Sequence, residues 1–310
     1  MTTTAGGTVR VNGGPRRRQN PNSGQARAGV FFATPYLLLL TGFALIPAVY
    51  TVYLAFMSPT GGFAGFDTFV QVFNDYRFLR AFANLGLYAL LFLIPTMIIS
   101  IGLAVLLQSR APRVAATFRT LYYLPHAVVG VAGVLLWMFL LTPRISPIGG
   151  FLEWMGFSGF YDIVRPDSPA SLAALFALIA VWTSGQGILL MFAALSSVPE
   201  EVEEAAAIDG ANGWQVFWHI KLPILRKWIA YLLIISVASA TQLFAEPQLM
   251  VAVTNGAVGN NFSPLQLAYT YAYQYGNFPG AAAISLVLLV IGLAAAALVV
   301  RTTGLFKIEI

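Results

Sequence analysis

Long apolar stretches separated by short polar segments make up most of this chain. Six of the stretches have the roughly 20 mostly apolar residues that a helix needs to cross the hydrocarbon of a membrane. Their limits are 31–56, 85–107, 120–141, 172–195, 228–248 and 281–300. Several contain proline, which a membrane helix tolerates when neighbouring helices bond the freed carbonyl groups. The pattern predicts an all-α, polytopic membrane protein with six transmembrane helices.

The composition argues against most other classes of protein. Of the 310 residues, 58% are hydrophobic and only 9% are charged, whereas a soluble domain carries about 25% charged residues. These values disfavour a large soluble core of buried helices, and also a disordered chain, which would be rich in charge. The first stretch is too long for the apolar region of a signal peptide. The chain has no cysteine, which excludes a disulfide or a thiolate metal site.

Basic residues are distributed unevenly among the segments that join the stretches. If both ends of the chain are inside, four of the 17 lysines and arginines lie in outer loops, namely Arg77, Arg80, Arg144 and Arg165, and the other 13 lie inside. Cytoplasmic segments of membrane proteins carry such an excess of positive charge. We therefore expect both termini to be cytoplasmic. The basic residues are scattered at helix ends and form no stripe, so the net charge of +5 does not indicate nucleic-acid binding.

The ends of the chain differ from the apolar part. Residues 1–29 are rich in Gly, Thr, Asn and Arg without an apolar period, which predicts a disordered cytoplasmic tail. Residues 30–305 are expected to form the transmembrane domain, and 306–310 a short cytoplasmic tail. In the outer segment 57–84, four apolar residues have helical spacing, namely Phe66, Phe69, Val70 and Phe73. That helix is expected either to lie along the outer membrane surface or to pack on the bundle.

The longest inner loop, 196–227, has the sequence of two helices. Ser196 or Ser197 is expected to cap the first helix, in which four glutamates crowd the opening turn and Gly210 is a natural stop. A second helix is predicted from about Gly213, with a break at Leu222-Pro223 before the fifth stretch. The pair either caps the bundle or offers its small alanine side chains to another protein.

The loop contains a spaced pattern. The pattern consists of Glu204-Ala205-Ala206, then Gly210, then Ile220-Lys221-Leu222-Pro223. It resembles the EAA signature of ABC importer permeases. The segment from Ile208 to Ala211 is typical of the sugar branch. The segments 118–125, 182–199 and 242–256 also resemble the carbohydrate permeases related to the maltose-type importer. The resemblance covers about 30–305.

The resemblance implies a type I ABC importer permease fold in a bacterial inner or plasma membrane. It implies that the loop contains a coupling helix that docks on an ATPase subunit. Its implied partners are a second permease subunit, two ATPase subunits and an extracytoplasmic solute-binding protein. The residues expected to couple to the ATPase are Glu204, Ala205, Ala206, Asp209, Gly210, Ile220, Leu222 and Pro223.

The same resemblance places sugar contacts on the helices before and after the loop. The matching polar or aromatic positions, together with two further polar candidates at the end of the fifth stretch, are Trp182, Thr183, Gln186, Ser236, Ser239, Gln242 and Glu246. Such residues suit a sugar, which needs groups that match its hydroxyls beside an aromatic face. Ala240 replaces an amide-bearing residue of the maltose-type protein, which argues against maltose itself.

Motifs for other chemistry are absent from the sequence. It contains no G-x-x-x-x-G-K-[ST] pattern, so ATP and Mg are expected in the partner ATPases, with no cofactor and no enzyme activity in this chain. His126 and His219 lack metal-ligand spacing. An ion-coupled carrier is the alternative from another class, but only His126 and Glu246 are ionisable candidates within the stretches. A polyol or glycerol-phosphate importer is the closer alternative, although a phosphate would favour basic residues along the pathway.

Overall fold

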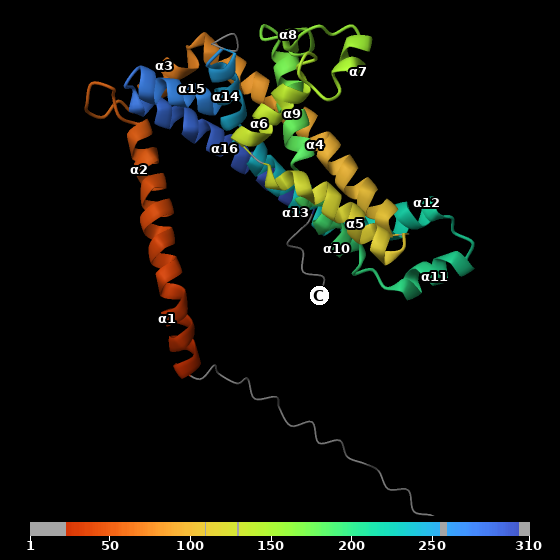
Figure 1. The fold of residues 1–310 in the computed structure, drawn as a ribbon. Coiled ribbons are helices and arrows are strands. Elements are labelled where there is room, and N and C mark those ends of the chain that lie inside the picture. The colour runs from red at the N-terminus through yellow and green to blue at the C-terminus, as the bar shows by residue number, and fades with distance from the viewer. Residues whose placement is uncertain (1–22, 109, 129, 255–258, 304–310) are drawn as a thin grey trace, which may run out of the picture. The chain divides into compact units, whose positions relative to one another are not determined.

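A computed structural model describes residues 23–108, 110–128, 130–254 and 259–303 (Figure 1). Within these ranges the regular structure is helical, and the one extended pairing is an isolated bridge between Met57 and Phe63. The predicted all-α fold class is therefore confirmed.

The described residues divide at Tyr50 into two units. The first unit holds α1 (Ser23–Leu40), the π-helical stretch η1 (Thr41–Leu45) and the start of α2 (Ile46–Ala55). Helix α1 begins within the predicted tail 1–29, so residues 23–29 of that tail are helical. The rest of that tail, and the predicted tail 306–310, lie outside the described residues.

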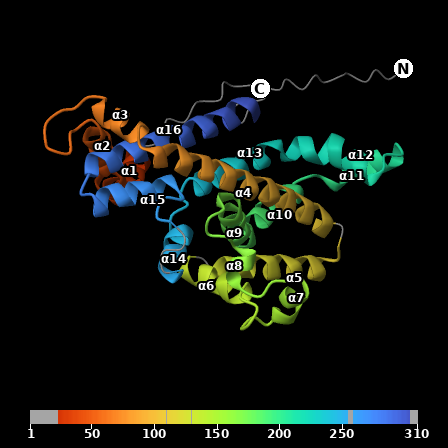
Figure 2. The ribbon, with the colours of Figure 1, turned by 90° about the horizontal axis from the view of Figure 1, so that it is seen from above.

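The helices of the second unit that bear on the site are α3 (Asp67–Phe73), α4 (Tyr76–Gln108), α5 (Pro112–Tyr123), α6 (Val131–Leu140), α9 (Pro169–Trp182), α10 (Gln186–Leu195), α11 (Glu200–Ile208), α12 (Gly213–Val216), α13 (Leu222–Ala240), α14 (Ala245–Val253), α15 (Pro264–Tyr269) and α16 (Phe278–Thr303). The unit is built around α4, which packs against α9, α10 and α13. Figure 1 shows α4 running from the region of α3 and α15 to the region of α11 and α12. In the view of Figure 2, α9 and α10 lie between α4 on one side and α5 and α6 on the other. Short helices α7 (Gly149–Trp154) and α8 (Phe160–Ile163) precede α9.

The described residues contain four helical stretches long and apolar enough to cross a membrane, and up to six if each of two bent helix pairs is one span. One bent pair is α5 (Pro112–Tyr123) with the 3₁₀ turn η2 (Leu124–Ala127), followed by α6 (Val131–Leu140). The other is α9 (Pro169–Trp182) followed by α10 (Gln186–Leu195), with a bend of 51°. Each predicted stretch therefore has a helical counterpart, although three of them, 120–141, 172–195 and 228–248, are interrupted.

The helix predicted from the aromatic spacing in segment 57–84 is α3, and it packs on the bundle. Phe69 and Val72 are buried in a cluster with Ala283 and Ile284 of α16. Phe66 and Phe73 remain exposed. Of the two placements expected for this helix, packing on the bundle is the one observed.

The helix boundaries around the fifth stretch differ from the sequence prediction. Leu222-Pro223 does not break the helix, because α12 runs through a π-helical stretch, η3 (Phe217–Lys221), directly into α13. Pro223 lies in the first α-helical turn, and the wider π turn bonds the Leu222 N–H to the Phe217 carbonyl. At the other end, α13 stops at Ala240 and a turn separates it from α14, so 228–248 is not one helix.

Candidate functional site

The first helix of the loop, α11, ends at Gly210 as predicted. The Gly210 N–H bonds the Ala207 carbonyl (3.1 Å), and the Ala211 N–H bonds the Ala206 carbonyl (2.9 Å). This pair of bonds is a Schellman motif, in which the residue after the cap takes a left-handed conformation. Gly210 has a φ of 79°, so the stop depends on glycine.

The start of α11 differs from the prediction. Its N-cap is Pro199, which provides no side-chain hydrogen bond. The hydroxyls of Ser196 and Ser197 instead donate to the Phe192 and Ala194 carbonyls at the end of α10. The two serines therefore terminate the preceding helix, a common competing use of short hydroxyl side chains.

The second helix of the loop begins at Gly213, as predicted, and is held by a reciprocal cap. The Gln215 N–H donates to Asn212 Oδ1 (2.9 Å), and the Asn212 N–H donates to Gln215 Oε1 (2.8 Å). Trp214 and Trp218 pack edge to face, with ring centroids 5.5 Å apart. An open groove of about 320 Å³ lies between the turn after α11 and the second helix, lined by Asp209, Gly210, Ala211, Gln215, Val216, His219 and Ile220.

Three side chains join the loop to the end of α4. Lys221 Nζ donates to Gln108 Oε1 (2.9 Å) and pairs with Glu203 Oε2 (3.0 Å). Gln108 Nε2 donates to the other carboxylate oxygen of Glu203 (3.2 Å). All three are partly buried, so solvent competes less with these charge-assisted bonds than it does at an exposed pair. We call this set the Gln108 tether; sequence reasoning missed it because its members are 95 and 113 residues apart.

Most of the predicted coupling residues are exposed. Glu204, Ala205, Asp209, Gly210 and Pro223 are exposed. The remaining three are half-buried, namely Ala206, Ile220 and Leu222. The exposed side chains at the end of the short helix α11 leave this part of the loop accessible to solvent.

Two helix breaks meet inside the bundle. The break between α9 and α10 leaves the Thr183 carbonyl without its helical partner, and His126 Nδ1 lies 2.8 Å from it. His126 belongs to η2, in the other bent pair. Gly185 fits closely here, since a Cβ on it would lie 2.5 Å from the Tyr122 carbonyl oxygen. Irregular backbone within a membrane needs such partners, and His126, which lacks metal-ligand spacing, is placed to provide one.

The break also corrects the expected relation of Trp182 to Gln186. Helix α9 ends at Trp182 and α10 begins at Gln186, so the two residues do not share one helical face. Trp182 packs edge to face against Trp137, with ring centroids 5.8 Å apart. Gln186 is exposed, Trp182 is half-buried, and the Thr183 hydroxyl bonds carbonyls of its own helix.

The predicted pathway residues beyond the loop lie on α13, on α14 and in the turn between them. Ser236 is buried, Ser239 and Gln242 are exposed, and Glu246 is half-buried in the first turn of α14. Gln242 lines an open groove of about 490 Å³ whose walls come mainly from α13 and α16. Among the described residues, no hydrogen bond or ion pair joins these side chains to Trp182, Thr183 or Gln186.

An ion pair lies at the end of α4 that is remote from the loop. Asp75 accepts from Arg77 Nε (2.9 Å) and from the Tyr271 hydroxyl (2.8 Å), while Arg77 Nη1 donates to the Tyr275 hydroxyl (2.8 Å). The bonds from Arg77 hold the pKa of the Asp75 carboxyl at about 2, below its usual 3.8. This network joins the start of α4 to η4 (Thr270–Gln274) and to Tyr275 directly after it.

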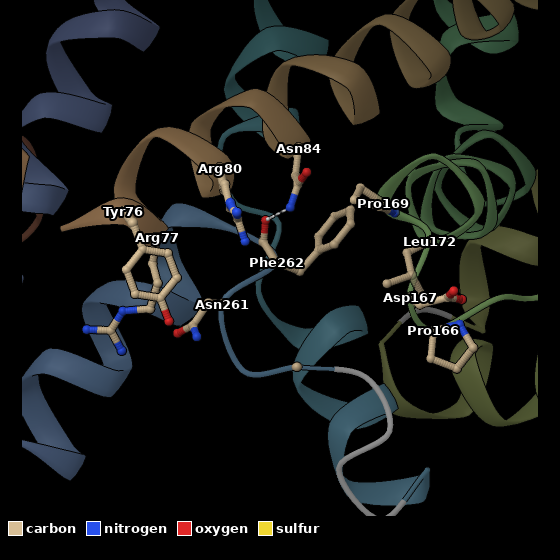
Figure 3. Close-up of a pocket in the computed structure, with 11 residues that line it drawn as sticks. Tyr76, Arg77, Arg80, Asn84, Pro166, Asp167, Pro169, Leu172, Asn261 and Phe262 are labelled. Carbon is tan, nitrogen blue, oxygen red and sulfur yellow. Dashed lines mark hydrogen bonds between the residues drawn. The ribbon is translucent and has the colours of Figure 1, made fainter.

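A polar pocket of about 270 Å³ lies beside this network (Figure 3). Figure 3 shows Tyr76, Arg80 and Asn84 on α4, with Asp167 and Leu172 on the opposite wall. The Asn84 side chain donates to the Phe262 carbonyl (3.2 Å). The pocket is lined by Tyr76, Arg77, Arg80, Asn84, Pro166, Asp167, Pro169, Leu172, Gly259, Asn261 and Phe262. None of these was a predicted site residue.

Comparisons with known proteins agree with this architecture. The chain is 29% identical to the diacetylchitobiose uptake system permease protein NgcF of Streptomyces coelicolor, over 94% of this chain and 87% of that protein. It is 30% identical to the sn-glycerol-3-phosphate transport system permease protein UgpA of Pectobacterium atrosepticum, over 84% of this chain and 88% of that protein.

A chain of the bacterial alginate ABC transporter, solved in complex with alginate pentasaccharide-bound periplasmic protein, superposes with a TM-score of 0.75. That alignment has 22% identity and covers 90% of this chain and 95% of the other. The family model described as "binding-protein-dependent transport system inner membrane component" matches residues 76–303, which hold both helix breaks and the whole loop. The chain therefore belongs to the family of binding-protein-dependent transport system inner membrane components.

Proposed function

We propose that this chain is a transmembrane permease subunit of an ATP-driven sugar importer and forms half of the translocation pathway. The observation that carries the proposal is the family match over 76–303, combined with the EAA-spaced loop held to α4 by the Gln108 tether. Diacetylchitobiose and alginate, named for two of the similar proteins, are carbohydrates.

The partners in this proposal are a second permease subunit, two ATPase subunits and an extracytoplasmic solute-binding protein. The similar alginate transporter was solved with a periplasmic protein bound to its sugar, which supports the last of these. ATP and Mg would be bound by the ATPases. In this arrangement the loop faces the cytoplasm of a bacterial cell and both termini are cytoplasmic, consistent with the excess of basic residues in those segments.

The mechanism follows from how the loop is attached. An ATPase that docks on Glu204 to Pro223 would move α11, and the Gln108 tether would pass that movement to α4. Because α4 packs against α9, α10 and α13, a shift of α4 reaches the helices that carry Trp182, Gln186 and Ser239. The expected result is alternating access, with the pathway opening on one side of the membrane at a time.

A glycerol-phosphate importer is the second candidate, favoured by the likeness to UgpA. A phosphate would be expected to meet arginine or lysine along the pathway. The predicted pathway residues on α9, α10, α13 and α14 include no basic side chain. A neutral sugar therefore fits these residues better.

Reconstitution in liposomes tests the proposal. The chain alone should show neither ATP hydrolysis nor sugar uptake, because the sequence has no nucleotide-binding loop. Co-reconstitution with the sister permease, the ATPases and loaded binding protein should give ATP-dependent uptake. Robust uptake by the lone chain under a proton gradient would contradict the importer and support an ion-coupled carrier.

A further inference from the structure

Two opposite charges face the pocket of Figure 3 without pairing. The described structure shows no ion pair or hydrogen bond of the Arg80 or Asp167 side chain, and the guanidinium of Arg80 lies over the Tyr76 ring, 5.5 Å from its centroid. Both residues are exposed. An arginine and an aspartate on opposite walls of one pocket, too far apart to bond each other, leave a donor and an acceptor for something placed between them.

The remaining polar groups of the pocket add to this pattern. Asn261 Oδ1 is a buried acceptor with no hydrogen-bond partner. Tyr76 offers an exposed aromatic ring, and Leu172 and Phe262 supply apolar walls. Planar polar groups that converge beside an aromatic face are the combination that recognises a sugar ring, whose edges carry hydroxyls and whose faces are apolar.

The balance of charge indicates which kind of sugar. Arg77 is already neutralised by Asp75 (2.6 Å). This leaves one positive and one negative side chain, Arg80 and Asp167, so the pocket has no net excess of either sign. A phosphate or uronate would gain from Arg80 and be repelled by Asp167, whereas a neutral hydroxyl-bearing ring can accept from the first and donate to the second.

The geometry points to a neutral-sugar subsite at the outer mouth of the pathway, which receives one ring of the substrate as it leaves the binding protein. This inference rests on the proposed function and names a site that the predicted pathway residues do not include. The volume of about 270 Å³ is near the lower end of ligand pockets, which suits a single ring.

Uptake by the full reconstituted transporter tests the subsite. The wild-type complex is first assayed with maltose, trehalose, diacetylchitobiose, an alginate trisaccharide and sn-glycerol 3-phosphate, each with its loaded binding protein. Arg80→Gln and Asp167→Asn are then measured with the neutral sugar that is transported. Each variant should lower the maximal uptake rate about tenfold, the factor that one hydrogen bond to a charged group provides.

Two readouts separate a sugar subsite from a docking surface for the binding protein. The binding-protein concentration that half-saturates ATPase stimulation should stay unchanged in both variants, and so should complex yield and melting temperature. Arg165→Gln and Glu153→Gln remove exposed charges of the same sign outside the pocket and should transport normally. A shifted half-saturating concentration would assign the pocket to protein docking and overturn the inference.

A thiol probe supplies independent evidence, because the chain has no cysteine of its own. Pro169→Cys places a thiol on the pocket wall, and Ile145→Cys places one on an exposed site elsewhere. In a complex with cysteine-free partners, an excess of the transported sugar should slow the reaction of the thiol at position 169 with a charged methanethiosulfonate. The rate of the same reaction at position 145 should not change.

The outcomes distinguish this inference from the proposed function. If no probe shows ATP-dependent uptake, the proposed function fails and the subsite fails with it. The subsite alone is refuted by two results together. A neutral sugar is transported at the normal rate by both Arg80→Gln and Asp167→Asn, and that sugar does not slow modification of the thiol in Pro169→Cys. Transport confined to sn-glycerol 3-phosphate or the alginate trisaccharide would also refute a neutral-sugar subsite.

Discussion

At the scale of single residues, Gly210 has a role that no other residue type performs without strain. Its φ of 79° closes the Schellman motif and turns the chain from α11 toward α12. A side chain in this conformation costs roughly 1 kcal/mol or more. The predicted coupling residues lie on both sides of this turn, so their relative placement depends on one backbone angle.

Replacing Gly210 with proline should uncouple ATP hydrolysis from transport. Proline fixes φ near −65° and removes the N–H that bonds the Ala207 carbonyl. The loop should dock poorly while the helical bundle still assembles. Stimulation of the assembled ATPase by loaded binding protein, together with uptake, is the measurement. Gly213→Ala is the matched control, because a Cβ there meets nothing within 4 Å; normal stimulation in Gly210→Pro would count against the proposed coupling role.

Asp75 provides a prediction about pH. Its folded-state pKa of about 2 lies below the unfolded value of 3.8, so its bonds contribute stability that is fully present above about pH 4. That contribution should be lost as the pH falls from 4 toward 2, because the carboxylate becomes protonated. The melting temperature of wild type should exceed that of Asp75→Asn at pH 7, and the difference should shrink below pH 4. Asp67→Asn, which changes an exposed carboxylate nearby, is the control. A difference in melting temperature between wild type and Asp75→Asn that stays constant from pH 7 to pH 2.5 would contradict the lowered pKa of Asp75.

At the scale of helices, the two broken pairs depend on close packing between backbones. Gly185 lies where a Cβ would come within 2.5 Å of the Tyr122 carbonyl oxygen and 2.8 Å of Tyr123 Cα. Backbone atoms cannot swing aside as the end of a side chain can. Glycine therefore allows the break between α9 and α10 to lie directly against the end of α5.

Gly185→Ala should destabilise the bundle by about 1–3 kcal/mol, the usual cost of overpacking. Gly102→Ala is the control, since a Cβ there meets nothing within 4 Å and alanine favours a helix. The melting temperature of the purified chain in detergent should fall in the first variant and stay level or rise in the second. Equal melting temperatures would show that the helices separate more easily than the geometry indicates.

The Gln108 tether is the second contact between elements that invites a test. Lys221→Met keeps the length of the side chain but removes its bonds to Gln108 and Glu203. We expect ATP hydrolysis to continue in the assembled complex while uptake per ATP falls several-fold, because the loop would move without moving α4. Lys227→Met, an exposed basic residue further along α13, is the control. Unchanged coupling in Lys221→Met would show that the loop transmits movement by another route.

At the scale of the whole molecule, periodicity and composition predicted much of the fold. The length of the apolar stretches was enough to show where the long helices lie. Gly210 correctly marked the stop of the first loop helix, and Gly213 the start of the second. These signals are local, so they can be read from neighbouring residues. The break at 183–185 was missed because the sequence there, Thr183-Ser184-Gly185, is compatible with a helix until α5 packs against it.

The contacts that build the sites were less predictable, since they join distant residues. Gln108, Glu203 and Lys221 come from three elements, and Arg80 and Asp167 from two walls of one pocket. Nothing in the residues beside Gln108 reveals that an amide is needed there. Family resemblance identified Trp182 and Gln186 as candidates, but it could not show that a helix break separates them.

The continuous helix through Leu222-Pro223 has a mechanical consequence. From Gly213 to Ala240 the chain is helical without a gap, a length of about 40 Å at 1.5 Å per residue. A rod of that length acts as a lever: tilting it by about 5° at the loop displaces its far end by about 3–4 Å. Had the proline broken the helix, as the sequence suggested, the hinge would absorb such a tilt. The π turn instead keeps the helix continuous, so a tilt applied at the loop is carried along it to Ser239.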